Sequence, residues 1–189
     1  MGPDSLFHRA LDKFSDVAVV SAVTVLCCVL VVPAGRALRA STRVFLMDPA
    51  HAIREYFSEL RKPAGRLAVW WILVVALHVF AIFEWILIEN MVVRAGLISG
   101  MLIIYGVSVW FVPLAATVDD RSGELAKLAV AYFVSQPLRT FSCVIVVIVA
   151  IAVFVVLLPH SLFFGFLVFG IGQYVATIII SPPLGYTNK

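Results

Sequence analysis

The chain has 189 residues, of which 62% are hydrophobic and only 13% are charged, and its formal net charge is +3. Soluble domains contain about 25% charged residues. This composition, with a mean hydropathy of +1.06, therefore excludes an ordinary soluble domain and favours a membrane protein. The few cations are spread along the chain, so nothing indicates nucleic-acid binding.

Five apolar stretches occur in the chain, and a membrane-spanning helix needs about 20 mainly apolar residues. A soluble β-rich core would account for one such stretch but hardly for five. The pattern predicts a single all-α domain over residues 1–189, a polytopic membrane helix bundle with five transmembrane helices. The expected spans are residues 17–32, 67–88, 95–118, 140–158 and 162–180.

The first stretch is short enough to resemble a cleaved signal peptide, with small residues after Pro33 at a possible cleavage site. A signal peptide carries positive charge before its apolar run. Here Asp12 and Asp16 precede the run, and the arginines follow it. This order favours a retained anchor.

The cations are distributed unevenly between the two sides of the predicted spans. Three of the Lys and Arg residues fall on the side of the membrane where the N-terminus lies, and 11 fall on the opposite side. Short loops rich in Lys and Arg remain in the cytoplasm. The count predicts an outside N-terminus and a cytoplasmic C-terminus in the plasma membrane of a bacterial cell.

Each long cytoplasmic link contains a predicted amphipathic helix. The first covers residues 49–62, with Asp48 as its N-cap and Pro49 at its first position. Its apolar face is expected against lipid or the bundle and contains Ile53, Tyr56, Phe57 and Leu60. The second covers residues 123–136, with Ser122 as its cap and a face made by Leu125, Leu128, Ala129 and Tyr132.

Three arginines, Arg36, Arg39 and Arg43, recur at helical spacing after the first span. They are candidate contacts to an anionic inner leaflet. The alternative is that they are ordinary anchors on the positive side of the membrane.

Small residues recur along two predicted spans and are candidates for close helix packing. The third span contains a GxxxG pattern, and the fifth contains a stripe of small residues. Packing within the chain and a homo-oligomer interface both remain open. The candidates are Gly96, Gly100, Gly165, Gly172 and Ala176.

One polar residue lies near the middle of each of four spans, and these are Thr24, His78, Tyr105 and Gln173. Polar groups within a bilayer are functional candidates, and unpaired ones are costly there. They are predicted to form a polar layer, with His78 bonded to Tyr105 or Gln173. Structural hydrogen bonds between helices are the simpler interpretation.

No enzymatic motif is present: the chain has no Gly-rich phosphate loop, no HExxH and no nucleophile motif. The three cysteines, Cys27, Cys28 and Cys143, lack the spacing of a metal site or a disulfide framework, and Asp119 and Asp120 fit a solvated turn. No catalytic residue, metal or cofactor is therefore expected.

The order of several short motifs resembles the YesL family of bacterial membrane proteins, of which the chain looks like a distant member. The motifs are residues 30–40 (LVVPAGRALRA), 53–62 (IREYFSELRK), 112–115 (VPLA), 127–129 (KLA) and 138–140 (LRT). The chain departs from the family pattern at Pro33, which comes later than usual, and at Leu128, where Asn is common.

Members of this family often occur beside carbohydrate-uptake systems, so the resemblance implies that context. The expected function is a non-enzymatic accessory protein that supports a carbohydrate transporter or a related membrane complex. The alternative is a small-solute permease with a polar midplane site around His78. The expected partners are the lipid bilayer and either a membrane protein or further copies of this chain.

Overall fold

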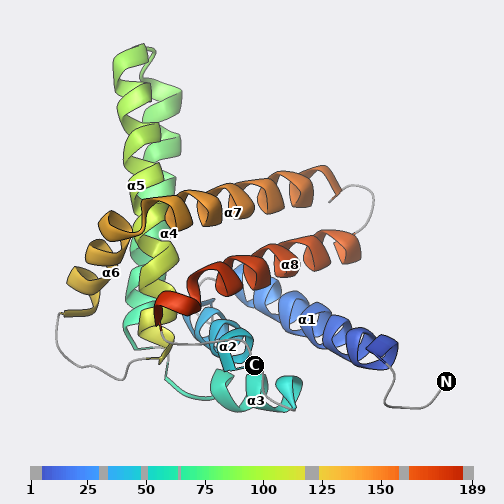
Figure 1. The fold of residues 1–189 in the computed structure, drawn as a ribbon. Coiled ribbons are helices and arrows are strands. Elements are labelled where there is room, and N and C mark those ends of the chain that lie inside the picture. The colour runs from blue at the N-terminus through green and yellow to red at the C-terminus, as the bar shows by residue number, and fades with distance from the viewer. Residues whose placement is uncertain are drawn as a thin grey trace.

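The computed structural model of the chain describes residues 6–29, 34–47, 51–63, 65–117, 124–157 and 162–184. Within the first and last α-helices it describes the side chains of residues 11–27 and 167–180. The described part of the chain is all-α (Figure 1). Its helices are α1 (Leu6–Val29), α2 (Ala34–Met47), α3 (Ala52–Leu60), α4 (Arg66–Leu87), α5 (Met91–Thr117), α6 (Glu124–Ser135), α7 (Pro137–Leu157) and α8 (Leu162–Ile180), followed by a 3-10 helix, η1 (Pro182–Leu184).

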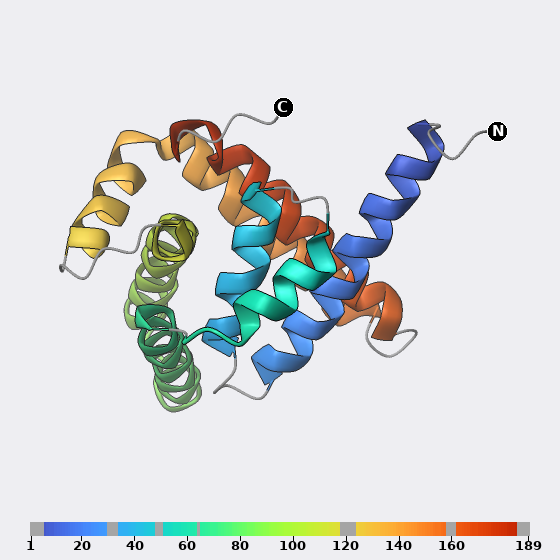
Figure 2. The same ribbon diagram turned by 90° about the horizontal axis from the view of Figure 1, so that it is seen from below.

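Two helical hairpins lie crosswise to one another. Helices α4 and α5 form a long antiparallel hairpin, and α7 and α8 form a second that runs across it (Figure 1). From below, the α4–α5 hairpin is seen end on, whereas α1, α7 and α8 lie across the view (Figure 2). The outer half of α4–α5 therefore extends beyond the other helices.

Three helices are long and apolar enough to cross a membrane, and they are α4, α5 and α7. A fourth apolar segment, Leu167–Ile180 in α8, is shorter over the part whose side chains are described. Helix α1 begins well before the predicted first span and carries Asp12, Lys13 and Asp16 in its first half. Membrane character is thus supported by three helices rather than by all five predicted spans.

The predicted helix boundaries are close to the observed ones for α4, α7 and α8. Helix α5 begins at Met91, four residues before the predicted start. Residues 36–43 belong to a separate helix, α2, and not to a continuation of the first span. The predicted start of the first amphipathic helix is wrong, because α3 begins at Ala52 with His51 rather than Asp48 at its N-cap. Residues 48, 119, 120 and 122 lie outside the described residues.

The loop between α4 and α5 is held by Arg94. Its Nε donates to the carbonyl oxygen of Ile88 at 2.9 Å, and a terminal nitrogen donates to that of Trp85 at 3.2 Å. The guanidinium also lies 5.0 Å from the Trp85 ring centroid. Because the last carbonyls of a helix have no intrahelical donor, Arg94 stabilises the end of α4.

Two hydrophobic clusters join the helices. One includes Leu67, Trp110 and Cys143 and lies among α4 to α8. The other includes Val20, Phe45 and Tyr56 and connects α1, α2 and α3. Helix α2 packs closely on α4, because a Cβ added at Gly35 would lie 2.6 Å from Ala68 Cα.

The face of α3 that packs on the protein includes Tyr56 from the predicted apolar face and also Glu59, which lies outside that face. Tyr56 is 1% exposed, as expected, but Phe57 is 43% exposed and Glu59 is only 5% exposed. The face is rotated because Glu59 binds Arg43 of α2 and Lys62. In α6, Leu125 and Ala129 are buried against the protein, whereas Leu128 is exposed and free to contact lipid.

Candidate functional site

A cavity of about 470 Å³ lies between the two hairpins. Side chains from α2, α4, α5, α7 and α8 line it, and most of them are apolar. No Lys, Arg, Asp, Glu or His is among its lining residues. The polar side chains on its wall are Thr42, Trp70, Trp71, Tyr105, Ser108, Gln173 and Thr177.

His78 and Tyr105 are hydrogen-bonded to each other across α4 and α5. The other ring nitrogen of His78, Nδ1, lies 2.7 Å from the carbonyl oxygen of Val74. A carbonyl only accepts, so Nδ1 donates, and in a neutral ring Nε2 accepts the Tyr105 proton. The predicted bond between His78 and Tyr105 is therefore present, and His78 itself does not line the cavity.

The predicted polar layer of four residues does not form in the described structure. Gln173 donates from Nε2 to Ser41 Oγ of α2 at 2.8 Å. Thr24 Oγ1 and the Tyr56 hydroxyl of α3 lie 3.0 Å apart. Helices α2 and α3, which are not among the predicted spans, provide the partners of Gln173 and Thr24. Only Tyr105 and Gln173 share the cavity wall.

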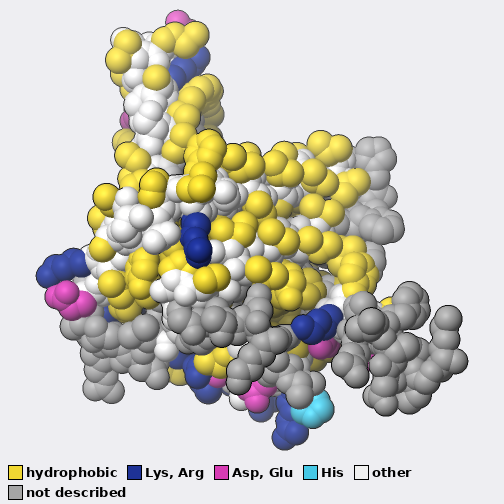
Figure 3. All heavy atoms as spheres, in the orientation of Figure 1, with side chains coloured by type: hydrophobic (Ala, Val, Ile, Leu, Met, Phe, Trp, Pro, Cys, Tyr) yellow, Lys and Arg dark blue, Asp and Glu magenta, His cyan; other side chains and the backbone are white. Residues whose placement is uncertain are grey.

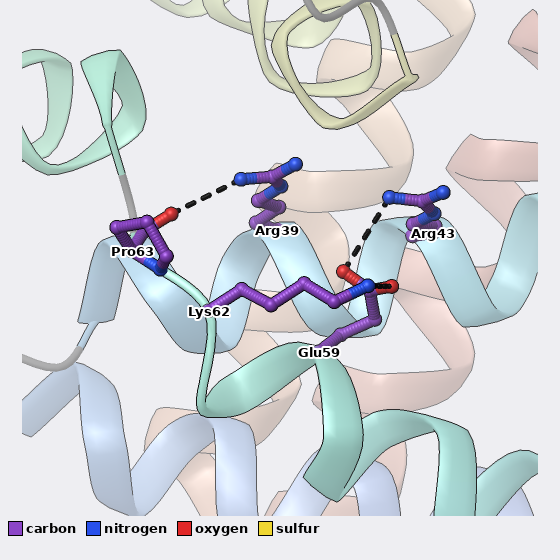
Figure 4. Close-up of polar contacts among 5 residues, drawn as sticks. All are labelled: Arg39, Arg43, Glu59, Lys62 and Pro63. Atoms are coloured by element: carbon purple, nitrogen blue, oxygen red, sulfur yellow. Dashed lines mark hydrogen bonds and ion pairs between the residues drawn. The ribbon is translucent and has the colours of Figure 1, made fainter.

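The arginines predicted to contact the inner leaflet have different surroundings. Arg36 is exposed. Arg39 and Arg43 extend from α2 toward α3 and the segment after it (Figure 4). Arg39 donates to the Pro63 carbonyl oxygen at 3.0 Å, and Arg43 lies 3.5 Å from Glu59 Oε2. These two side chains therefore join protein segments, while Arg36 remains a candidate lipid contact.

Glu59 is the centre of this charged cluster. Its Oε1 atom lies 2.5 Å from Lys62 Nζ, and its Oε2 atom faces Arg43 (Figure 4). A buried carboxylate is costly unless it is paired. The two cations allow Glu59 to be buried, and so they fix how α3 lies on α2.

Hydroxyl groups satisfy the indoles of two tryptophans near the cavity and core. Trp70 Nε1 donates to Ser108 Oγ at 3.1 Å, and Trp110 Nε1 donates to Thr140 Oγ1 at 2.8 Å. Sequence reasoning did not single out these pairs. The sequence does contain a signal for such bonds, because Ser and Thr residues occur within apolar segments that lie near others containing Trp.

The predicted small-residue positions fall into two groups. Gly172 packs against Ala150 of α7, where an added Cβ would lie 2.5 Å away, and Ala176 packs against the core. Gly96 and Gly100 face open space on α5. The surroundings of Gly165 lie outside the described residues. Gly35, Gly106 and Gly170 also make close approaches, although they were not singled out from the sequence.

The two cysteines whose side chains are described, Cys27 and Cys143, are both free. Cys143 is buried, with its Sγ 3.6 Å from the Ala176 carbonyl oxygen, and Cys27 is half-buried. The Cys28 side chain lies outside the described residues. Within the described part of the chain, no three His, Cys, Asp or Glu residues are grouped as metal ligands.

No family model matches the chain, and neither a curated protein nor a solved structure matches it. Functional interpretation therefore depends on the residues and their geometry.

Proposed function

We propose that the protein is a non-enzymatic, multi-pass membrane protein that binds a membrane partner through its α4–α5 hairpin. The observation that carries this proposal is the uncovered outer half of the hairpin. Ile86, Met91 and Val92 are each more than 70% exposed. Figure 3 shows hydrophobic side chains over the visible surface of the hairpin, with charged side chains at its tip.

The outward face of α5 favours a protein partner in addition to lipid. Gly96 and Gly100 lie one turn apart with nothing within 4 Å of an added Cβ. In membranes, small residues at this spacing let a second helix approach closely. Farther along the same helix, Gly106 already has Phe133 packed against it. A partner helix on the outer half would extend this type of packing.

The class of partner comes from the resemblance to the YesL family. That resemblance supports a carbohydrate-uptake transporter or a related complex in a bacterial cell membrane. A second copy of this chain is the other partner to distinguish. Neither assignment requires a catalytic residue or cofactor in this chain.

Five spans, with the N-terminus outside and the C-terminus in the cytoplasm, remain the proposed topology. Because the α4–α5 and α7–α8 hairpins lie crosswise, both pairs must tilt from the bilayer normal to cross the same bilayer. Reporter fusions at residue 189 and in residues 51–62 should report cytoplasm, and a label at Asn90 should be accessible from outside.

The alternative of a small-solute permease has less support. Both ring nitrogens of His78 have partners. The cavity has no charged lining residue and mostly apolar walls, whereas a sugar needs many polar partners along its path. Transport assays with His78→Gln and His78→Leu would favour a permease if both variants fold and both alter solute flux.

The partner is tested by photo-crosslinking in native membranes. A photoreactive residue at Val92 or Ile98 should give one specific protein adduct, identified by mass spectrometry. Matched positions are Val155 and Val156, which are exposed on α7, and they should not give that adduct. Lipid adducts alone at the hairpin positions would contradict partner binding, and an adduct with this same chain would identify a homo-oligomer.

A further inference from the structure

Glu84 is the only acidic residue in the two helices of the α4–α5 hairpin. It lies in the last turn of α4, and the residues one turn before and after it on the same face, Phe80 and Leu87, are exposed apolar side chains. Ionisable groups among membrane-facing apolar residues are costly, and in membrane proteins they generally pair with another polar or charged group. The Glu84 carboxylate therefore requires a partner.

The described part of the chain does not supply that partner. The Glu84 carboxylate forms no hydrogen bond or ion pair among the described residues. Arg94 is the only cation of α5, and its guanidinium donates to the carbonyl oxygens of Ile88 and Trp85 instead. Glu59 is an internal comparison, because that carboxylate is covered by protein and is paired with two cations.

The direction of the Glu84 side chain disfavours its solvation at the tip of the hairpin. The Cα–Cβ bonds of an α-helix tilt toward the N-terminus of the helix. Helix α4 runs toward the tip, where the chain turns at Glu89 and Asn90 before α5 begins. The Glu84 side chain therefore leans away from this turn and toward the apolar part of the hairpin.

Glu84 lies on the same face of the hairpin as Gly100. The bonded pair His78 and Tyr105 marks the flank of the α4–α5 contact that faces the cavity, because Tyr105 lines it. At 3.6 residues per turn, Glu84 is turned by about 120° around α4 from His78. Gly100 is turned by about 140° around α5 from Tyr105. Because the two helices are antiparallel, both turns lead to the flank that faces away from the cavity.

Glu84 is also level with the open glycines of α5. Along the hairpin toward its tip, Glu84 is six residues beyond His78, and Gly100 and Gly96 are five and nine residues from Tyr105. At 1.5 Å per residue, Glu84 lies about 9 Å beyond the bonded pair, and the glycines lie about 7.5 and 13.5 Å beyond it. A helix packed on the Gly96–Gly100 surface would therefore cover the carboxylate.

We propose that a transmembrane helix of another membrane protein packs on this face and pairs a Lys or Arg side chain with Glu84. This inference rests on the proposed binding of a membrane partner by the hairpin, and it specifies the chemistry of that partner. The glycines permit the close approach, and the charge pair fixes the depth of the partner helix. A second copy fits less well, because Arg94, the hairpin cation nearest the tip, already binds two carbonyl oxygens.

The test is photo-crosslinking of the full chain in native membranes. The photoreactive residue replaces Val93, which is exposed and lies two turns before Gly100 on the same helix. The expected result is one protein adduct, and mass spectrometry should show a Lys or Arg within the apolar length of the crosslinked partner helix.

Variants of Glu84 test the charge pair. Glu84→Gln keeps the shape of the side chain and removes its charge, so it should lower the yield of the adduct at least about tenfold, as loss of one member of a covered charge pair does. Glu89→Gln is the matched control, because Glu89 is exposed at the turn, and it should leave the yield unchanged. Glu84→Lys should abolish the adduct, and replacing the cation of the partner by Glu should restore it.

The outcomes separate this inference from the function on which it rests. Lipid adducts alone would contradict both proposals. A protein adduct whose yield survives Glu84→Gln, or whose helix carries no Lys or Arg, would overturn the charge pair and leave partner binding intact. An adduct with this same chain would overturn the choice of another protein as partner. If Glu84→Gln fails to fold, the sequence of the crosslinked helix and the charge exchange decide the question.

Discussion

His78 and Tyr105 connect the two helices of the projecting hairpin, with their ring centroids 5.3 Å apart in an edge-to-face arrangement. The hydrogen bond between them lies near the middle of both helices, where Tyr105 also lines the cavity. The pair is therefore well placed to hold α4 against α5. This makes the bond a direct target for substitution.

Replacing His78 should destabilise the hairpin according to the hydrogen-bonding capacity of the new residue. His78→Leu removes the bond, whereas the amide of His78→Gln can still accept from Tyr105. We expect a loss of about 0.6–1.7 kcal/mol for Leu and a smaller loss for Gln. Unfolding in mixed micelles measures both, and Tyr105→Phe combined with His78→Leu should cost no more than His78→Leu alone. An additive double variant would contradict the proposed bond.

Tyr56 should anchor α3 to α1. The Tyr56→Phe change removes the hydroxyl 3.0 Å from Thr24 Oγ1, and we expect a loss of about 0.5–1.5 kcal/mol in the free energy of unfolding. Tyr56→Ala should also remove buried aromatic area and cost about 3–5 kcal/mol. Phe57→Ala is the matched control because Phe57 is exposed. Equal effects at positions 56 and 57 would contradict the observed orientation of α3.

Glu59 should contribute more to stability than the other glutamate of its helix. Glu59→Gln leaves Arg43 and Lys62 without their carboxylate. A hydrogen bond to a charged group contributes about 1.5–3 kcal/mol, and partial exposure of the cations favours the lower end of this range. Glu55→Gln, at an exposed position, should change stability by less than about 0.5 kcal/mol. Thermal unfolding of both variants makes the comparison.

Gly35 and Gly96 both follow an alanine in the sequence, but substitution by alanine should have opposite effects on stability at the two positions. At Gly35 an added Cβ would lie 2.6 Å from Ala68 Cα, so Gly35→Ala should cost about 1–3 kcal/mol by overpacking α2 against α4. At Gly96 nothing lies within 4 Å, so Gly96→Ala should be neutral or stabilise α5 by up to about 1 kcal/mol. If the purified chain instead loses an oligomeric form with Gly96→Ala, then the Gly96–Gly100 surface of α5 packs against another copy.

Helix positions in the long apolar segments were predictable because a single property decides them. A run of apolar residues long enough for a bilayer forms a helix whatever its neighbours are, and α4 and α8 match their predicted ranges within one residue. Depth along the spans predicted that His78 would bond Tyr105 or Gln173, and the structure pairs it with Tyr105. Gln173 and Thr24 share that depth, but their partners depend on rotation and on which helix lies beside them.

The sequence by itself determined the all-α class, the membrane character and the approximate ranges of α4, α7 and α8, because these depend on composition and on local periodicity. Only the tertiary structure decided that Glu59 is buried and Phe57 exposed, and that Gly35 makes a close approach while Gly96 does not. It also decided that Trp71 and Gln173 line one cavity. These features arise from contacts between segments far apart in the chain. They depend on how each helix is rotated about its own axis and on how the two hairpins cross. Neither can be derived from the hydrophobic pattern of a single helix.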